Sequence, residues 1–234
     1  MSSRQKNILE PILLFVLFYL PGYLWPQAEM VQESGELGLY MLQFMLIALP
    51  QILLLLYLLN LRSSDQGHHY SDFGLLRLKA ADLLQALLIF AGIFLLLTVL
   101  GLILSLIPAA DRSILSSGFR WKLDNPRLIP LVLLFCLVVG YREELFFRSY
   151  FLTRLSQLHI PAAVGIGMST LLFAAGHAYQ GVSGLIVALI QGLYFAILFI
   201  RLKNIHPLAI AHALYNTSVL IVSLFADTGL PVNP

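Results

Sequence analysis

Apolar residues fill seven long runs of the chain, and the short segments between these runs hold most of the charged side chains. A helix needs about 20 mostly apolar residues to cross the hydrocarbon core of a bilayer, and the runs are close to or above that length. They are continuous and rich in leucine rather than alternating, which favours helices over a transmembrane barrel. The predicted membrane spans are residues 8–25, 37–61, 80–107, 128–155, 159–179, 182–202 and 206–225.

This pattern predicts an all-α fold, a polytopic helical membrane protein with about seven to eight transmembrane helices. An eighth would come from a missed or re-entrant segment after the third run. The fourth run, residues 128–155, is longer than a bilayer requires. We therefore expect its helix to tilt, to break near Gly140 or to protrude from the membrane.

The composition supports the same class of protein. The 234 residues are 59% hydrophobic and 11% charged, whereas soluble proteins carry about 25% charged residues. An ordinary soluble domain is therefore excluded. The single cysteine, Cys136, rules out an internal disulfide and a cysteine-based metal cluster.

The charges indicate how the chain is oriented. The net charge is +2, and the basic residues lie mostly at the ends of the predicted spans, which gives no sign of nucleic-acid binding. If the N-terminus is cytoplasmic, the alternation of spans places eight Lys and Arg residues inside and four outside. We therefore expect a multi-pass protein of the cell membrane with a cytoplasmic N-terminus.

Four charged residues interrupt the fourth run, in the stretch YREELFFRSY at residues 141–150. A charge at the centre of a membrane helix costs roughly 2.5–3.5 kcal/mol, so such a cluster suggests a functional site inside the helix bundle. Glu144 and Arg148 are four residues apart and share a helix face, where they can neutralise each other as a buried pair. Glu143 is rotated by about 100° from Glu144 and needs another partner.

Two later runs supply polar groups that can serve as that partner. Phe173 and His177 are four residues apart in the fifth run, and His212 and Asn216 are four residues apart in the seventh. Each group alone has an ordinary explanation, because intramembrane His and Asn side chains often only join helices by hydrogen bonds. Together they offer two imidazoles and an amide to an unpaired carboxylate.

Three motifs in this order resemble the signature of a known family. They are E-E-x-x-x-R at Glu143, Glu144 and Arg148, F-x-x-x-H at Phe173 and His177, and H-x-x-x-N at His212 and Asn216. Together they resemble the CPBP intramembrane proteases, which include the type II CAAX prenyl proteases and bacteriocin-processing enzymes of the Abi family. The resemblance covers the predicted catalytic core, residues 128–225. Residues 1–127, with three undiagnostic spans, and a short tail at 226–234 flank this core.

The resemblance implies an intramembrane endopeptidase that acts on a membrane-associated protein or peptide. Glu143 and His177 would activate the attacking water, and His212 and Asn216 would stabilise the oxyanion. Glu144, Arg148 and Phe173 would be supporting residues. The expected partners are the lipid bilayer and a peptide or membrane-anchored substrate, with no nucleic acid.

The cofactor stays open at this point. The family is commonly described as metalloproteases, and Glu143, His177 and His212 could form a three-ligand zinc site with an open position. A metal-free glutamate mechanism has also been argued for the family. The H-E-x-x-H signature of helical zinc peptidases is absent from this sequence.

Two other functions compete with the peptidase. One is a non-catalytic membrane scaffold or immunity factor that retains the polar residues. The other is a proton-coupled transporter with a relay of Glu and His side chains. The sequence shows neither an inverted repeat nor paired broken helices, which argues against the transporter.

Overall fold

A computed structural model of the chain describes residues 3–21, 37–65, 70–106, 123 and 125–225. The described residues form helices and connecting segments and contain no strand, so the predicted all-α fold is confirmed. The helices are α1 (Ser3–Phe18), α3 (Leu37–Asp65), α4 (Ala80–Ser105), α5 (Ile129–Glu144), the π-helix η5 (Leu145–Leu152), α6 (Thr153–Gln157), α7 (Ala162–Ala175), α8 (Gly181–Leu202) and α9 (His206–Ser223). Short 3₁₀ turns lie at η2 (Tyr70–Phe73), η4 (Pro126–Leu128) and η6 (Ala178–Gln180).

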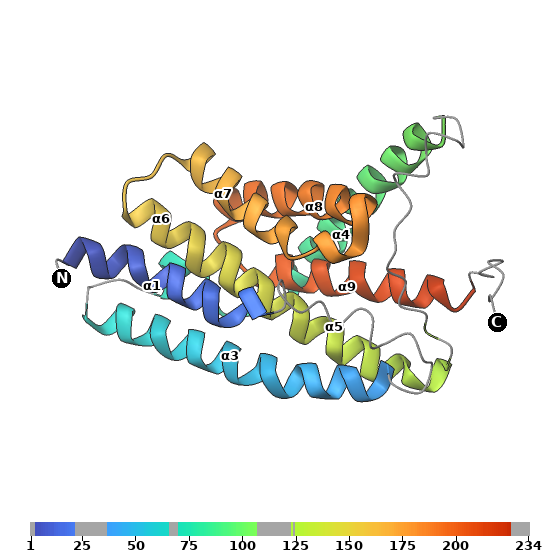
Figure 1. The fold of residues 1–234 in the computed structure, drawn as a ribbon, viewed down its shortest axis with the longest axis horizontal. Coiled ribbons are helices and arrows are strands. Elements are labelled where there is room, and N and C mark those ends of the chain that lie inside the picture. Colours follow the sequence, from blue (N-terminus) through green and yellow to red (C-terminus); the bar gives the residue numbers. More distant parts are fainter. Residues whose placement is uncertain (1–2, 22–36, 66–69, 107–122, 124, 226–234) are drawn as a thin grey trace.

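The helices form a bundle around the segment that carries the charged cluster. Figure 1 shows α5 continuing into η5 and α6 through the middle of the molecule, with α1 and α3 on one side and α7 and α8 on the other. Helix α9 lies against α5, in the most extensive helix contact of the described residues. The cluster is thus surrounded by helices from both halves of the chain.

The bundle is a helical membrane protein. Among the described residues, three stretches are long and apolar enough to cross a bilayer, namely Leu37–Leu61, Ala80–Ser105 and Ala178–Leu202. Shorter apolar helices occur at Leu9–Phe18 and Ala162–Ala175, so the count of seven to eight spans stays a prediction. The predicted first span reached residue 25, but α1 ends at Phe18, and residues 22–36, like the tail at 226–234, lie outside the described residues.

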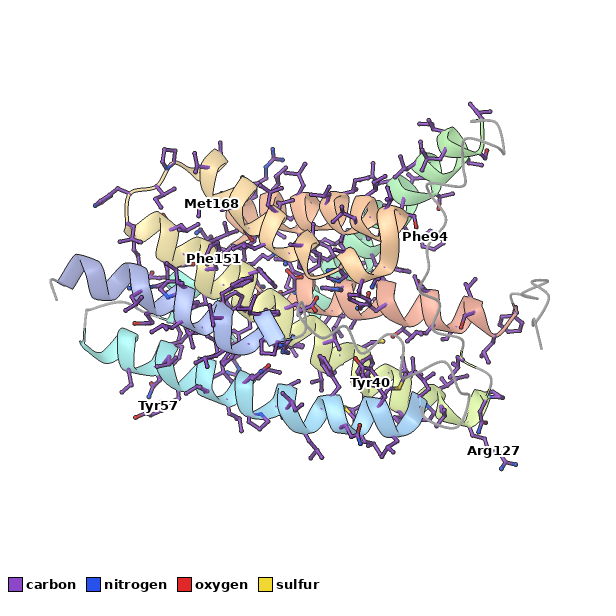
Figure 2. All side chains as sticks on the ribbon, viewed as in Figure 1. Tyr40, Tyr57, Phe94, Arg127, Phe151 and Met168 are labelled. Atoms are coloured by element: carbon purple, nitrogen blue, oxygen red, sulfur yellow. The ribbon has the colours of Figure 1, made fainter. Side chains whose placement is uncertain are left out.

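The outer surface of the bundle is apolar, as lipid contact requires. Leu84, Leu88, Leu95 and Leu102 follow one face of α4, and each is more than 60% exposed. Figure 2 shows Tyr57 of α3 and Phe94 of α4 at the edge of the molecule, and both are about half exposed. Such a continuous apolar face would favour aggregation in water, whereas lipid chains cover it at no cost.

Helices α5 and α9 approach closely because of Gly140. A Cβ atom at this position would lie 2.6 Å from the carbonyl oxygen of Ala209 and 3.2 Å from the amide nitrogen of Ala213. Small residues at such crossings let membrane helices pack backbone to backbone. Gly140 lies one turn before Glu144 on α5, and the two alanines that it faces lie on either side of His212 in the sequence of α9. The close approach of the helices here therefore sets the distance between the Glu144 and His212 side chains.

The predicted break near Gly140 does not occur. The chain stays helical through Gly140, and its winding changes at Leu145, where the π-helix η5 begins directly after Glu144. π-Helices are rare, and they occur frequently at functional sites. Serine side chains tie this segment to its neighbours: Ser149 Oγ donates to the Phe73 carbonyl at 2.6 Å, and Ser169 Oγ donates to the Phe147 carbonyl at 3.0 Å.

The Gly140 crossing yields a stability prediction. The substitution Gly140→Ala should lower the free energy of unfolding by about 1–3 kcal/mol, because the added methyl group forces the two backbones apart. Gly101→Ala is the matched control, since a Cβ atom on that α4 glycine meets nothing within 4 Å. Thermal unfolding in detergent measures both variants. Equal midpoints for the two would show that α5 and α9 do not depend on this contact.

Candidate active site

Glu144 and Arg148 form a buried ion pair across the start of the π-helix. Arg148 Nε lies 3.2 Å from Glu144 Oε2, and both side chains are fully buried. Arg148 Nη2 also donates to the carbonyl oxygen of Gly192 in α8, at 3.3 Å. The guanidinium carbon lies 4.5 Å from the ring centroid of Phe173, close enough for a cation–π contact. The pair predicted from the sequence is therefore present.

His212 of α9 lies between the two glutamates. Its Nδ1 atom is 2.8 Å from Glu144 Oε1, and its Nε2 atom is 3.7 Å from Glu143 Oε2. The imidazole is buried, and its ring packs near Phe173 and Phe195 at centroid distances of 5.9 and 5.5 Å. Glu143 thus finds the partner on another helix that its orientation requires.

The hydrogen-bond pattern indicates where the His212 protons lie. Glu144 faces the Arg148 guanidinium, so it accepts as a carboxylate and His212 Nδ1 donates to it. On the other side of the ring, Nε2 and Glu143 Oε2 face each other. Glu143 Oε2 is buried and has no hydrogen-bond partner among the described residues. A buried acceptor of this kind requires a proton or a donor nearby.

His177 lies just beyond the end of α7, not within it. Its Nδ1 atom is 2.9 Å from the carbonyl oxygen of Phe173, which can only accept, so Nδ1 carries the proton. The ring also packs on the Phe173 ring at 4.7 Å. The bond satisfies a free carbonyl at the helix end and leaves Nε2 as the basic nitrogen of the neutral ring.

The described contacts do not join every predicted site residue. Glu143, Glu144, Arg148, Phe173 and His212 form one connected group, and His177 joins it through the Phe173 ring.

No described contact links His177 directly to Glu143. Tyr179, two residues further along, is near enough to the Glu143 carboxylate to interact with it electrostatically. Asn216, one turn beyond His212 on α9, is half-buried, and its side chain makes no hydrogen bond within the part of the chain that the structure describes.

The metal hypothesis was tested on the same side chains. Among the described residues, no group of three His, Cys, Asp or Glu side chains is arranged to hold a metal ion. The candidate ligands Glu143, His177 and His212 therefore do not form a ligand set in this arrangement. His212 instead directs both ring nitrogens towards carboxylates.

A comparison with protein families identifies the region that contains this site. Residues 125–218 match the family model of the type II CAAX prenyl endopeptidases, Rce1-like. This stretch of the chain is similar to an Rce1-like domain. This confirms the resemblance to the CPBP proteases, and the family indicates a membrane protease. Neither the curated proteins nor the solved structures gave a match to this chain.

The matched stretch contains all the predicted site residues, and it also contributes residues that the motifs did not suggest. Phe147 and Phe195 lie 5.8 and 5.9 Å from the Arg148 guanidinium and complete an aromatic enclosure with Phe173. No polar or spacing signal marks these two rings in an apolar sequence. Gly140 was visible as a small residue, but its contact with α9 was not.

The buried pair within the matched stretch yields a second prediction. Arg148→Met should lower the free energy of unfolding by about 3–5 kcal/mol and reduce the yield of folded protein, because it leaves Glu144 buried without its cation. Arg201→Met removes an exposed arginine at the end of α8 and serves as the control. Unfolding in detergent and the fraction of monodisperse protein measure the effect. Equal stability of the two variants would show that Glu144 does not need Arg148.

Proposed function

We propose that this protein is an intramembrane endopeptidase in which Glu143 activates water to hydrolyse a peptide bond of a membrane-associated protein or peptide. The observation that supports this proposal is the buried Glu143 Oε2 atom, which faces the His212 imidazole at 3.7 Å and has no hydrogen-bond partner among the described residues. Such an oxygen can accept a proton from water. Its buried surroundings have a low dielectric constant, which strengthens the electrostatic interactions between the site and the reacting groups.

Water attack needs a base, and the arrangement offers two acceptors. Glu143 takes one proton of the attacking water while the oxygen bonds to the substrate carbonyl carbon. The His177 Nε2 lone pair accepts a hydrogen bond from the same water, because Nδ1 is held as the donor by Phe173. Glu143 then returns the proton to the leaving nitrogen when the C–N bond breaks. The products are a carboxylic acid and an amine, between which a proton then passes to give a carboxylate and an ammonium group, and Glu143 is again a carboxylate as at the start.

The tetrahedral intermediate needs donors for its oxyanion. We assign this role to His212 Nε2–H and to the Asn216 amide, one turn apart on α9. In the resting site, His212 Nε2 faces Glu143 Oε2 at 3.7 Å, and we assign one proton to this pair. With that proton, the charges of Glu143, Glu144, Arg148 and His212 sum to zero, which suits a site of low dielectric constant. A substrate carbonyl entering this space takes the Nε2–H donor and leaves Glu143 as the base.

The supporting residues act by orientation. Glu144 keeps His212 in the Nδ1–H form, and Arg148 pairs with the Glu144 carboxylate. Phe173 holds His177 through its carbonyl group and packs against both imidazoles. Since the described donors do not converge as a metal-ligand set, no step of this mechanism passes through a metal.

The substrate class follows from the position of the site in the membrane. We propose a peptide or membrane-anchored protein whose scissile bond enters from the side or from the aqueous face. The matched family is described as prenyl endopeptidases, so a prenylated C-terminal peptide is one substrate to test. We also propose a multi-pass arrangement in the cell membrane with a cytoplasmic N-terminus.

The base is tested by Glu143→Gln, which keeps the shape of the side chain and removes its ability to take a proton. Peptide cleavage in liposomes should fall at least about 10²-fold, within the range general bases contribute, while the thermal midpoint stays near that of the wild type. Asp72→Asn makes the same chemical change at an exposed acid of η2 and should keep full turnover. Full turnover by the Glu143 variant would remove the proposed mechanism and favour the scaffold.

The oxyanion donor is tested by Asn216→Ala. This substitution should lower kcat by about 10²–10³ with little change in KM, because the amide acts on the transition state and not on the bound substrate. Asn60→Ala, on α3, is a control amide that lies outside the matched domain. A rise in KM without loss of kcat would assign Asn216 to substrate binding instead.

A further inference from the structure

Arg142 is a buried cation that the proposed reaction does not use, although it directly precedes Glu143. It is only 8% exposed. Its Nε atom donates to Gln51 Oε1 of α3 at 2.6 Å, and its Nη2 atom donates to the Phe18 carbonyl oxygen of α1 at 2.6 Å. The guanidinium carbon also lies 4.2 Å from the centroid of the Tyr19 ring. One side chain thus joins three helices.

The contact with Phe18 explains why a charge is stable at this place. Helix α1 ends there, and the last carbonyl groups of a helix generally have no partners within it. The C-terminal end of a helix also carries a partial negative charge that a cation stabilises. Arg142 supplies both the hydrogen bond and the charge, so α1 can end beside the catalytic segment.

Tyr19, directly after α1, makes a second contact with α5. Its hydroxyl group donates to the carbonyl oxygen of Arg142 at 3.2 Å, which lies just before the change from α-helix to π-helix. The Tyr19 ring packs against Phe146 and Phe147 of the π-helix, at centroid distances of 4.9 and 4.8 Å. The backbone on both sides of Glu143 is therefore held by the end of α1.

We propose that Arg142 and Tyr19 are positioning residues for Glu143, and that the end of α1 is part of the catalytic apparatus. This inference rests on the proposed function. His212 holds the two glutamates from the side of α9, whereas Arg142 and Tyr19 hold the same backbone from the side of α1 and α3. Catalytic groups need to be fixed to within about 0.5 Å, and a shift of 1 Å can cost about 10²-fold in rate.

The end of α1 lies outside the matched domain, which begins at residue 125. Its role therefore comes from the contacts of this structure and not from the family. It also gives a function to the N-terminal part of the chain, which the sequence motifs left without one.

The experiment compares Tyr19→Phe with Tyr194→Phe in the liposome cleavage assay. Tyr19→Phe keeps the ring and removes one hydroxyl-to-carbonyl bond, and we expect kcat to fall about tenfold with unchanged KM and thermal midpoint. Tyr194→Phe removes the same kind of bond, from Tyr194 to the Ile89 carbonyl of α4, at a place that does not touch Glu143. It should keep the wild-type kcat.

Two arginine variants separate position from charge. Arg142→Gln should lower kcat about 10²-fold, and Arg142→Lys should restore part of that loss by keeping the cation at the end of α1. Where Arg142→Gln does not fold, the Tyr19→Phe result decides. A wild-type kcat for Tyr19→Phe, or equal losses in Tyr19→Phe and Tyr194→Phe, would overturn the inference.

The Glu143→Gln variant in the same assay distinguishes the two proposals. If that variant keeps full turnover, the proposed function itself fails. If it is inactive while Tyr19→Phe and the folded Arg142 variants match the wild type, only the positioning role of α1 fails.

Discussion

The site depends on one buried carboxylate, Glu144, which is shared by Arg148 of its own helix and His212 of α9. A buried charge in this position is stable only with a partner of opposite charge. If Arg148 is removed, the Glu144 carboxylate stays buried at low dielectric constant without its cation. The shared carboxylate therefore fixes both the depth of α9 and the orientation of its imidazole. It also leaves Glu143, the next carboxylate, to face the other ring nitrogen of His212.

The backbone around this contact is adapted to it. Gly140 lets α5 and α9 approach closely enough for Glu144 to contact His212, and the π-helix begins directly after Glu144. The Nδ1–H group of His177 donates to the Phe173 carbonyl oxygen at the end of α7, and this bond leaves Nε2 as the nitrogen with a free lone pair. Arg142 and Tyr19 fix the opposite side of the same segment against α1. Irregular helix geometry of this kind is tolerated in a membrane because side chains satisfy the freed backbone groups.

The sequence was sufficient for the features that depend on spacing along one helix. Membrane helices follow from apolar runs, and the Glu144–Arg148 pair follows from a separation of four residues. The position of His212 between the two glutamates depends on how far α9 is shifted along α5, and the spacing of residues within either helix does not determine that shift. The early end of α1 was also hidden, because its apolar run continues past Phe18. Arg142 stood in the predicted cluster, but its partners lie 91 and 124 residues away.

The most direct test of water activation by Glu143 is single-turnover cleavage of a membrane-inserted peptide in ¹⁸O-labelled water, with the metal content measured on the same preparation. The mechanism predicts ¹⁸O in the new C-terminal carboxylate of the product, none in the Glu143 side chain, and unchanged turnover with a chelator. Label in Glu143 would instead indicate a covalent intermediate on that residue. Turnover that is lost with the chelator and restored by zinc would contradict the glutamate mechanism.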